Sequence, residues 1–97
     1  MTTGVCKIKL HIPASQSLKE KRRIIKSIIS RLRNQFNISI AEVDDCDLWQ
    51  LATLGISCVS NSRQHVDEVL TKVMKFVEQC YPDVEVVDHE IEIMHGP

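Results

Sequence analysis

Residues 17–36 read SLKEKRRIIKSIISRLRNQF and predict the first helix of the fold. Ser17 and Glu20 are three residues apart and form a capping box, in which the two side chains satisfy free backbone N–H groups at the helix start. Apolar residues then recur at helical spacing along one face, which predicts packing against a core. This face carries Leu18, Ile25, Ile28, Ile29, Leu32 and Phe36. We expect an amphipathic helix over residues 18–35.

The segments on either side of this helix have the alternation of β-strands. From residue 5 to residue 12 the even positions are apolar, and Lys7, Lys9 and His11 lie between them. This pattern predicts a half-buried strand that ends at Pro13. After the helix, two more strands are predicted at residues 38–43 and 48–59, joined as a hairpin by the polar turn 44–47.

A second helix and a last strand complete the order of elements. Ser60, Asn61 and Ser62 supply caps for a helix with a regular apolar stripe, and Pro82 follows its end. Residues 84–94 then alternate as a strand. The order β-α-β-β-α-β predicts an α+β fold, the ferredoxin-like βαββαβ sandwich. We expect a four-stranded antiparallel sheet of order 4-1-3-2, with both helices on one face.

Composition and charge set limits on the class of protein. The chain has 97 residues, 43% hydrophobic and 26% charged, which fits one domain over residues 1–97. Net charge is −1, yet residues 19–33 hold seven cations and one acid, which leaves five cations and twelve acids elsewhere. A basic stripe on a nearly neutral protein predicts a local anion site more than a general attraction to polyanions.

The cations of the first helix are the candidates for binding phosphate or RNA. A helix N-terminus carries partial positive charge, so cations there are unfavourable unless an anion or nearby acids accompany them. An RNA phosphate and a solvated face with internal salt bridges to the acids of residues 44–47 are equally good explanations. The candidate residues are Lys19, Lys21, Arg22, Arg23, Lys26 and Arg33.

The predicted topology brings the start of the first helix, the turn at 44–47 and the start of the last strand to one end of the domain. Asp44, Asp47, Trp49 and Gln50 therefore adjoin the basic helix as surface candidates. A lone Trp is more often a core or interface anchor than a stacking platform. The open face of the sheet lacks the aromatic residues that bind RNA on this fold. The open face is instead a candidate surface for pairing with a second copy of this chain.

No catalytic, metal or cofactor site is predicted. His11, His65, His89 and His95 lack paired ligand spacing, and the chain has no Gly-rich phosphate loop or nucleophile elbow. The four cysteines lie far apart and read as reduced thiols. No signal peptide or membrane span is evident, so we expect a cytoplasmic protein without membrane contact.

Three motifs together carry a family resemblance: residues 17–23, residues 36–44, and residues 47–50 with 52–55. The chain resembles the YlxP-like, or DUF503, family of small bacterial proteins. The resemblance implies a ferredoxin-like domain of unassigned activity, often encoded beside ribosome-binding factor A and translation initiation factor two. The positions matching the family pattern are Lys19, Glu20, Lys21, Arg22, Arg23, Glu42, Asp44, Asp47, Trp49 and Gln50.

Two main functional hypotheses follow from the residues and the resemblance. The first is a non-enzymatic protein that contacts ribosomal RNA or the small ribosomal subunit through the basic helix, in ribosome maturation or translation. The second is a homodimeric protein-interaction module that binds no nucleic acid. An enzyme at the end formed by residues 44–50 is a third and weaker hypothesis.

Overall fold

Six elements follow one another in the predicted order, in a computed structural model that describes residues 1–97. The first helix has the predicted bounds, whereas the first strand begins three residues earlier and the third strand three residues later than expected. The elements are β1 (Thr2–His11), α1 (Leu18–Gln35), β2 (Ser39–Asp44), β3 (Leu51–Ser60), α2 (Arg63–Cys80) and β4 (Glu85–His95).

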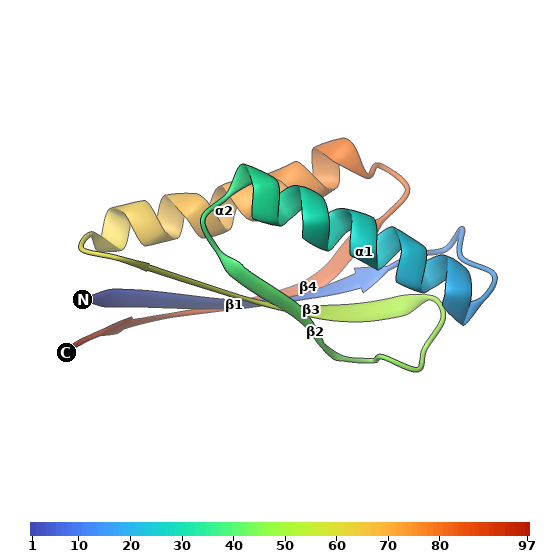
Figure 1. Ribbon diagram of the computed structural model, residues 1–97, viewed down its shortest axis with the longest axis horizontal. Helices are drawn as coiled ribbons and strands as arrows, with labels where there is room; N and C mark the ends of the chain where they lie inside the picture. The colour runs from blue at the N-terminus through green and yellow to red at the C-terminus, as the bar shows by residue number, and fades with distance from the viewer.

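The four strands form one antiparallel sheet of order β2-β3-β1-β4, and both helices lie on one face of it (Figure 1). The predicted strand order and the ferredoxin-like plan are confirmed. In this register Lys7 lies between Gly55 of β3 and Glu90 of β4. The side chains expected on the open face therefore lie away from the helices, because successive residues of a strand point to opposite faces.

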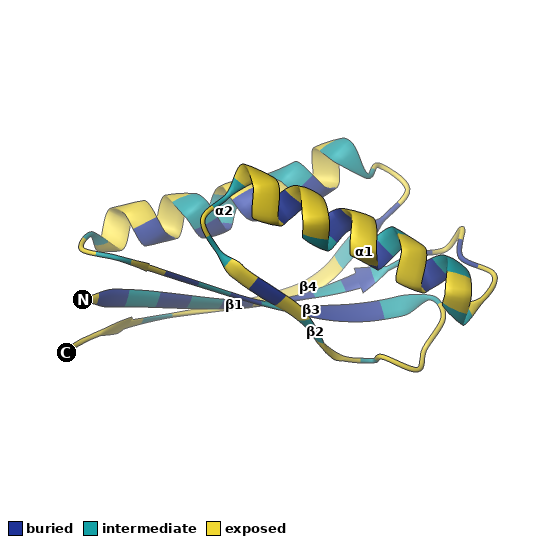
Figure 2. Cartoon of the chain, in the orientation of Figure 1, coloured by how far each residue is buried: buried dark blue, intermediate teal, exposed yellow.

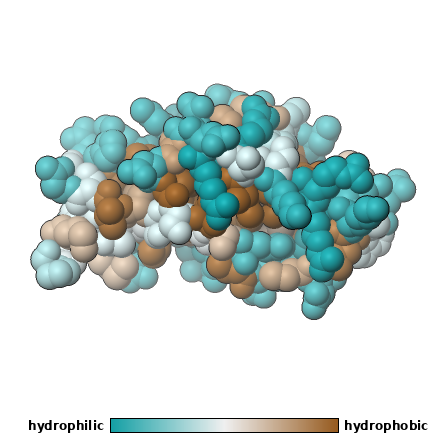
Figure 3. All heavy atoms as spheres, viewed as in Figure 1, coloured by the Kyte–Doolittle hydropathy of each residue, from teal (hydrophilic) through white to brown (hydrophobic).

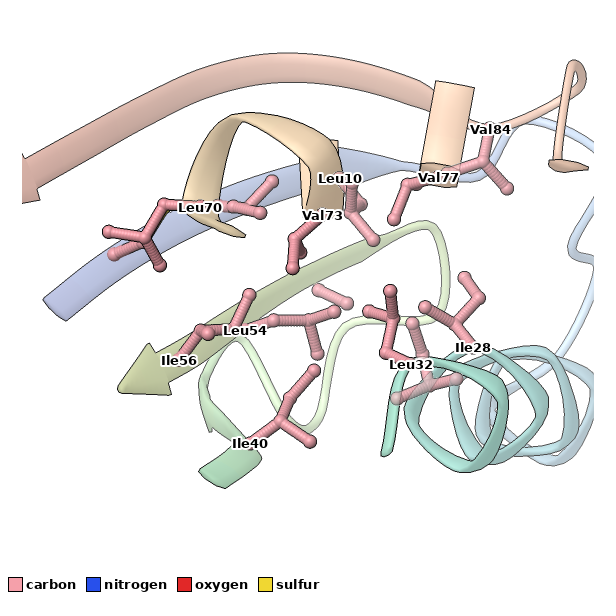
Figure 4. Close-up of a cluster of buried hydrophobic side chains, with 14 of the residues drawn as sticks. Leu10, Ile28, Leu32, Ile40, Leu54, Ile56, Leu70, Val73, Val77 and Val84 are labelled. Carbon is pink, nitrogen blue, oxygen red and sulfur yellow. The ribbon is translucent and has the colours of Figure 1, made fainter. Parts of the chain in front are cut away.

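A cluster of 17 buried apolar residues fills the space between the helices and the sheet (Figures 2 and 4). Ile28 and Leu32 of α1 and Leu10 and Leu54 of the central strands belong to this cluster, and all four are fully buried. Gly4 of β1 lets α2 come close, since a Cβ there would overlap Val66. Burial of apolar surface on this scale is the main force that holds the helices on the sheet.

The connection between β2 and β3 is a loop, not the short turn that the sequence suggested. A register shift after Glu42 ends the regular pairing of β2, and Asp45 adopts a left-handed conformation with φ 60°. Leu48 and Trp49 belong to this loop and are exposed, which is why β3 begins only at Leu51. Neither helix is long and apolar enough to cross a membrane.

Candidate functional site

The start of α1 is capped as the sequence predicted. The hydroxyl oxygen of Ser17 accepts a hydrogen bond from the backbone N–H of Glu20 at 3.1 Å. The carboxylate of Glu20 accepts one from the backbone N–H of Gln16 at 2.8 Å, one residue before the position that a standard capping box uses. These two bonds fix where the helix begins and hence where its cations lie.

Lys21 is fully buried, in contrast to the other candidate cations of α1. Its ammonium nitrogen donates to three backbone carbonyls: Asp45 at 2.8 Å, Leu51 at 3.0 Å and Cys46 at 3.2 Å. An ammonium group has three donors, so all of them are satisfied inside the protein. Lys21 thereby joins the first turn of α1 to the β2–β3 loop and to the start of β3.

The charge of Lys21 is balanced by Glu42 of β2. The Oε2 atom of Glu42 lies 3.0 Å from the Lys21 nitrogen, although it makes no well-aligned hydrogen bond because the ammonium protons point to the carbonyls. A buried charge is strongly unfavourable unless it is paired and hydrogen-bonded, and here it is both.

The prediction that Lys21 binds phosphate is therefore wrong. The physical reason is its position on the helix, because Lys21 lies on the same stripe as the buried residues Ile25, Ile28 and Leu32. The spacing of three and four residues between these positions was the sequence signal that distinguishes Lys21 from its neighbours. Glu42 is the partner that sequence reasoning left without a role, and only the register of β2 reveals it.

Asp45 ties the β2–β3 loop to the open face of the sheet. Its carboxylate accepts a hydrogen bond from the hydroxyl of Thr53 at 2.7 Å and lies 3.7 Å from the ammonium of Lys9. The pKa of Asp45 is lowered, chiefly by the hydrogen bond from Thr53 and then by the charges of Lys9 and Lys21. A carboxyl group with a lowered pKa stabilises the folded state at neutral pH.

Thr53→Val tests this arrangement through its pH dependence. Loss of the hydroxyl raises the pKa of Asp45 toward its ordinary value of about 3.9. The stabilisation by Asp45 is fully present above that ordinary value and is lost as the pH falls through the lowered pKa. Urea unfolding at pH 7 and at pH 3 is expected to show a smaller difference between wild type and variant at pH 3.

Thr3→Val supplies the matched control for this comparison. Thr3 also lies in a central strand, but the hydrogen bond from a threonine to a carboxylate is made by Thr53 alone. Its effect on the free energy of unfolding is expected to be the same at both pH values. A Thr53→Val effect that does not change between pH 7 and pH 3 would contradict the assignment.

Gln50 fixes the other side of the loop. Its side-chain amide donates to the carbonyls of Ser15 at 3.1 Å and Pro13 at 3.3 Å, and its backbone carbonyl accepts from the N–H of Ile12 at 2.8 Å. These contacts place Gln50 against the connection that precedes the basic helix, and no contact with the helix itself is among them. Its donors are used inside the protein, so Gln50 supports the loop.

The remaining cations of α1 are exposed and have no carboxylate partner. The salt bridges of the structure involve Lys9, His11 and Lys21. Salt bridges from these exposed cations to the acids of residues 44–47, one of the two alternatives that the sequence left open, are therefore absent. One exposed cation, Arg33, donates to the carbonyl of Ile40 in β2 at 3.0 Å. Arg31 is also exposed, but its guanidinium lies over the rings of Phe76 and Tyr81 of the α2 region. We call the other five exposed cations the basic face of α1, and they are Lys19, Arg22, Arg23, Lys26 and Arg33.

Trp49 lies at the end of the domain that the sequence predicted. Its side chain is 48% exposed, and it borders an open groove of about 430 Å³ together with Leu48, Leu51 and Val87. Asp47 is exposed in the same loop, and Asp44 is exposed at the end of β2 just before it. The hydrogen bonds of Lys21 and Gln50 hold the loop on both sides of Trp49, which remains partly exposed.

The structure brings together no group of three His, Cys, Asp or Glu side chains able to hold a metal ion. None of the four cysteines forms a disulfide, and burial raises the pKa of the Cys6 thiol to about 11. A thiol with a raised pKa is a poor nucleophile. The candidate site is thus an exposed basic helix beside a loop that is hydrogen-bonded to Lys21.

Comparison with known proteins places the chain among its relatives. The sequence model described as "Protein of unknown function (DUF503)" matches residues 3–91. The "Uncharacterized protein YlxP" of Bacillus subtilis (strain 168) is 42% identical over 69 residues, which is 71% of this chain and 74% of that protein.

Solved structures share the fold at low sequence identity. The de novo designed protein Foldit4 superposes with a TM-score of 0.55 at 12% identity, covering 98% of this chain and 99% of that one. The designed protein LFR1 1 with ferredoxin fold gives a TM-score of 0.55 at 15% identity, covering 97% and 84%. Both likenesses concern architecture alone. The family match and the bacterial relative show that the chain belongs to the YlxP-like, or DUF503, family.

Proposed function

We propose that this protein contacts the phosphates of ribosomal RNA through the basic face of α1, as a non-enzymatic participant in ribosome maturation or translation. The observation that supports this proposal most directly is that the five cations of the basic face have no carboxylate within salt-bridge distance, in a chain whose net charge is −1. Like charges this close on one helix repel one another. Binding of an anionic partner would offset the energetic cost of this repulsion.

The distribution of charge over the helix supports the same proposal. Hydrophilic side chains cover the outer surface of α1, while the hydrophobic ones lie between the helix and the sheet (Figure 3). Arg and Lys side chains that are free of internal partners form charge-assisted hydrogen bonds with phosphate oxygens without first breaking a salt bridge. Lys21 is excluded from this role, since it holds the helix in place while its neighbours bind.

The sheet offers a poorer surface for RNA. On this fold RNA bases commonly stack on aromatic residues of the central strands. The open face instead carries Lys7, Gly55 and Ser57 at its centre, with Glu90 and Glu92 along β4. Because carboxylates repel phosphates, the helical side of the molecule is the better site for a nucleic acid.

Sedimentation of the tagged protein in lysate through sucrose gradients tests this proposal. At low salt we expect the protein to migrate with small-subunit particles, and we expect high salt or RNase treatment to release it. Migration as a free protein under all three conditions would refute ribosome association.

A second candidate function, protein interaction as a homodimer, is supported by a separate observation. The open face of the sheet contains a hollow of about 570 Å³, lined in part by the small residues Ser39, Ala41, Gly55 and Ser57. Val59 is 62% exposed on the same strand as two of these residues. Self-association through this face predicts a protein that sediments as a dimer, independently of RNase and with little effect of salt.

A further inference from the structure

A groove of about 380 Å³ lies beside the basic face of α1. It is bounded by the β1–α1 connection, the first half of α1 and the segment that joins α2 to β4. Ile12, Ile24 and Val84 give it an apolar lining, and Arg23 is the one cation among its lining residues. The groove and the basic face therefore share a residue and form one continuous surface.

Polar side chains also line this groove, and interactions with their neighbours fix the positions of two of them. The hydroxyls of Ser27 and Tyr81 lie 2.8 Å apart in a hydrogen bond, and both residues line the groove. The guanidinium of Arg31 lies 5.3 Å from the centre of the Tyr81 ring, an interaction that holds the ring in place. Asp83 adds a carboxylate to the lining. An apolar lining with a few fixed polar groups is typical of sites that bind small molecules.

We infer that the groove receives an unpaired nucleobase of single-stranded RNA, while Arg23 and its neighbours on the basic face bind the adjoining phosphates. This inference rests on the proposed function and names the form of RNA that the site selects. An unpaired base has apolar faces and a polar edge, which match the apolar lining and the two hydroxyls with Asp83. The bases of a regular duplex are stacked and paired, so they cannot enter such a groove.

The charge around the groove favours RNA over a peptide segment. Arg22 and Lys26 lie on the same helix as Arg23, within one turn of it, and all three lack an acidic partner. A peptide in the groove would leave these neighbouring cations without a counter-charge. A nucleotide strand supplies one phosphate for every base, so the groove and the basic face are occupied together.

Binding of two labelled oligonucleotides, followed by fluorescence anisotropy, tests the inference. One is a ten-nucleotide single-stranded RNA, and the other has the same backbone and number of phosphates but consists of abasic residues. Because insertion or stacking of one base strengthens binding by a factor of about 5 to 150, we expect the wild-type protein to bind the intact strand about 10-fold more tightly. The salt dependence is expected to be the same for both strands.

Ala14→Leu fills the groove from an exposed lining position without changing charge or core packing. The 10-fold preference is expected to disappear in this variant, with binding of the abasic strand unchanged. Gln79→Leu is the matched control, since Gln79 is exposed on α2 and does not line the groove, and it is expected to keep the preference.

Three outcomes would overturn the inference. Equal binding of intact and abasic strands by the wild type would leave phosphate binding by the basic face in place and remove the groove as a base site. A preference retained in Ala14→Leu would place the base elsewhere. Failure to bind either strand at low salt would refute this inference together with RNA binding by the basic face.

Discussion

Replacing Lys21 by methionine is expected to lower the free energy of unfolding by about 3–5 kcal/mol, the usual cost of removing one partner of a buried ion pair. Methionine fills the space of the lysine stem but donates no hydrogen bond. The carbonyls of Cys46 and Leu51 would then lose this donor, and the carboxylate of Glu42 would lose its cationic partner. Denaturant unfolding measures the change, and Trp49, the only tryptophan, reports loosening of the loop through its fluorescence.

Two further variants separate this mechanism from a general effect of losing a lysine. Lys19→Met removes a cation from an exposed position two residues away and is expected to change stability by less than about 0.5 kcal/mol. The double variant Lys21→Met with Glu42→Leu is expected to recover part of the loss, because no unpaired charge remains buried. Equal effects of Lys21→Met and Lys19→Met would show that the buried network contributes little.

Reversing the charge of Arg22, Arg23 and Lys26 to glutamate is expected to weaken binding to ribosomal RNA about 100-fold at 0.1 M salt, since each phosphate contact contributes a factor of about five there. The variant is expected to fold, because all three positions are exposed and have no salt-bridge partner. Binding is measured with purified small-subunit RNA, and circular dichroism checks the fold.

The chain offers a matched control on the other helix. Arg63, Lys72 and Lys75 are exposed cations of α2, and their reversal to glutamate changes the net charge by the same amount. This control is expected to weaken RNA binding only a few-fold, through the general charge of the protein. If both triple variants lose affinity equally, the contact depends on net charge and not on the basic face of α1.

The architecture could be predicted from the sequence because its local signals agree with one another. Ser17 and Glu20 define the start of α1, and the apolar stripe of that helix has a clear period. Alternation along β1 and the order of elements then leave few ways to cover one face of a sheet. The bounds of β3 were less predictable, since Leu48 and Trp49 are apolar enough to resemble strand residues but lie in a loop.

The candidate site was only partly predictable. The sequence identified the basic helix and the end of the domain where the motifs meet, yet it grouped Lys21 with cations that point outward. The distinction depends on one helical position and on Glu42, which lies 21 residues away and reaches Lys21 only through the placement of β2. The role of Gln50 could not be predicted for the same reason, because the carbonyl groups that it contacts lie in a loop 35 or more residues earlier.

The salt dependence of binding to small-subunit RNA tests the central claim most directly, since it counts phosphate contacts. If all five cations of the basic face bind phosphates of unpaired RNA, the logarithm of the binding constant should fall with the logarithm of salt concentration with a slope of about −3.5. Reversal of Arg22, Arg23 and Lys26 should reduce that slope to about −1.4. A wild-type slope near zero, or one that the reversal leaves unchanged, would contradict phosphate binding by α1.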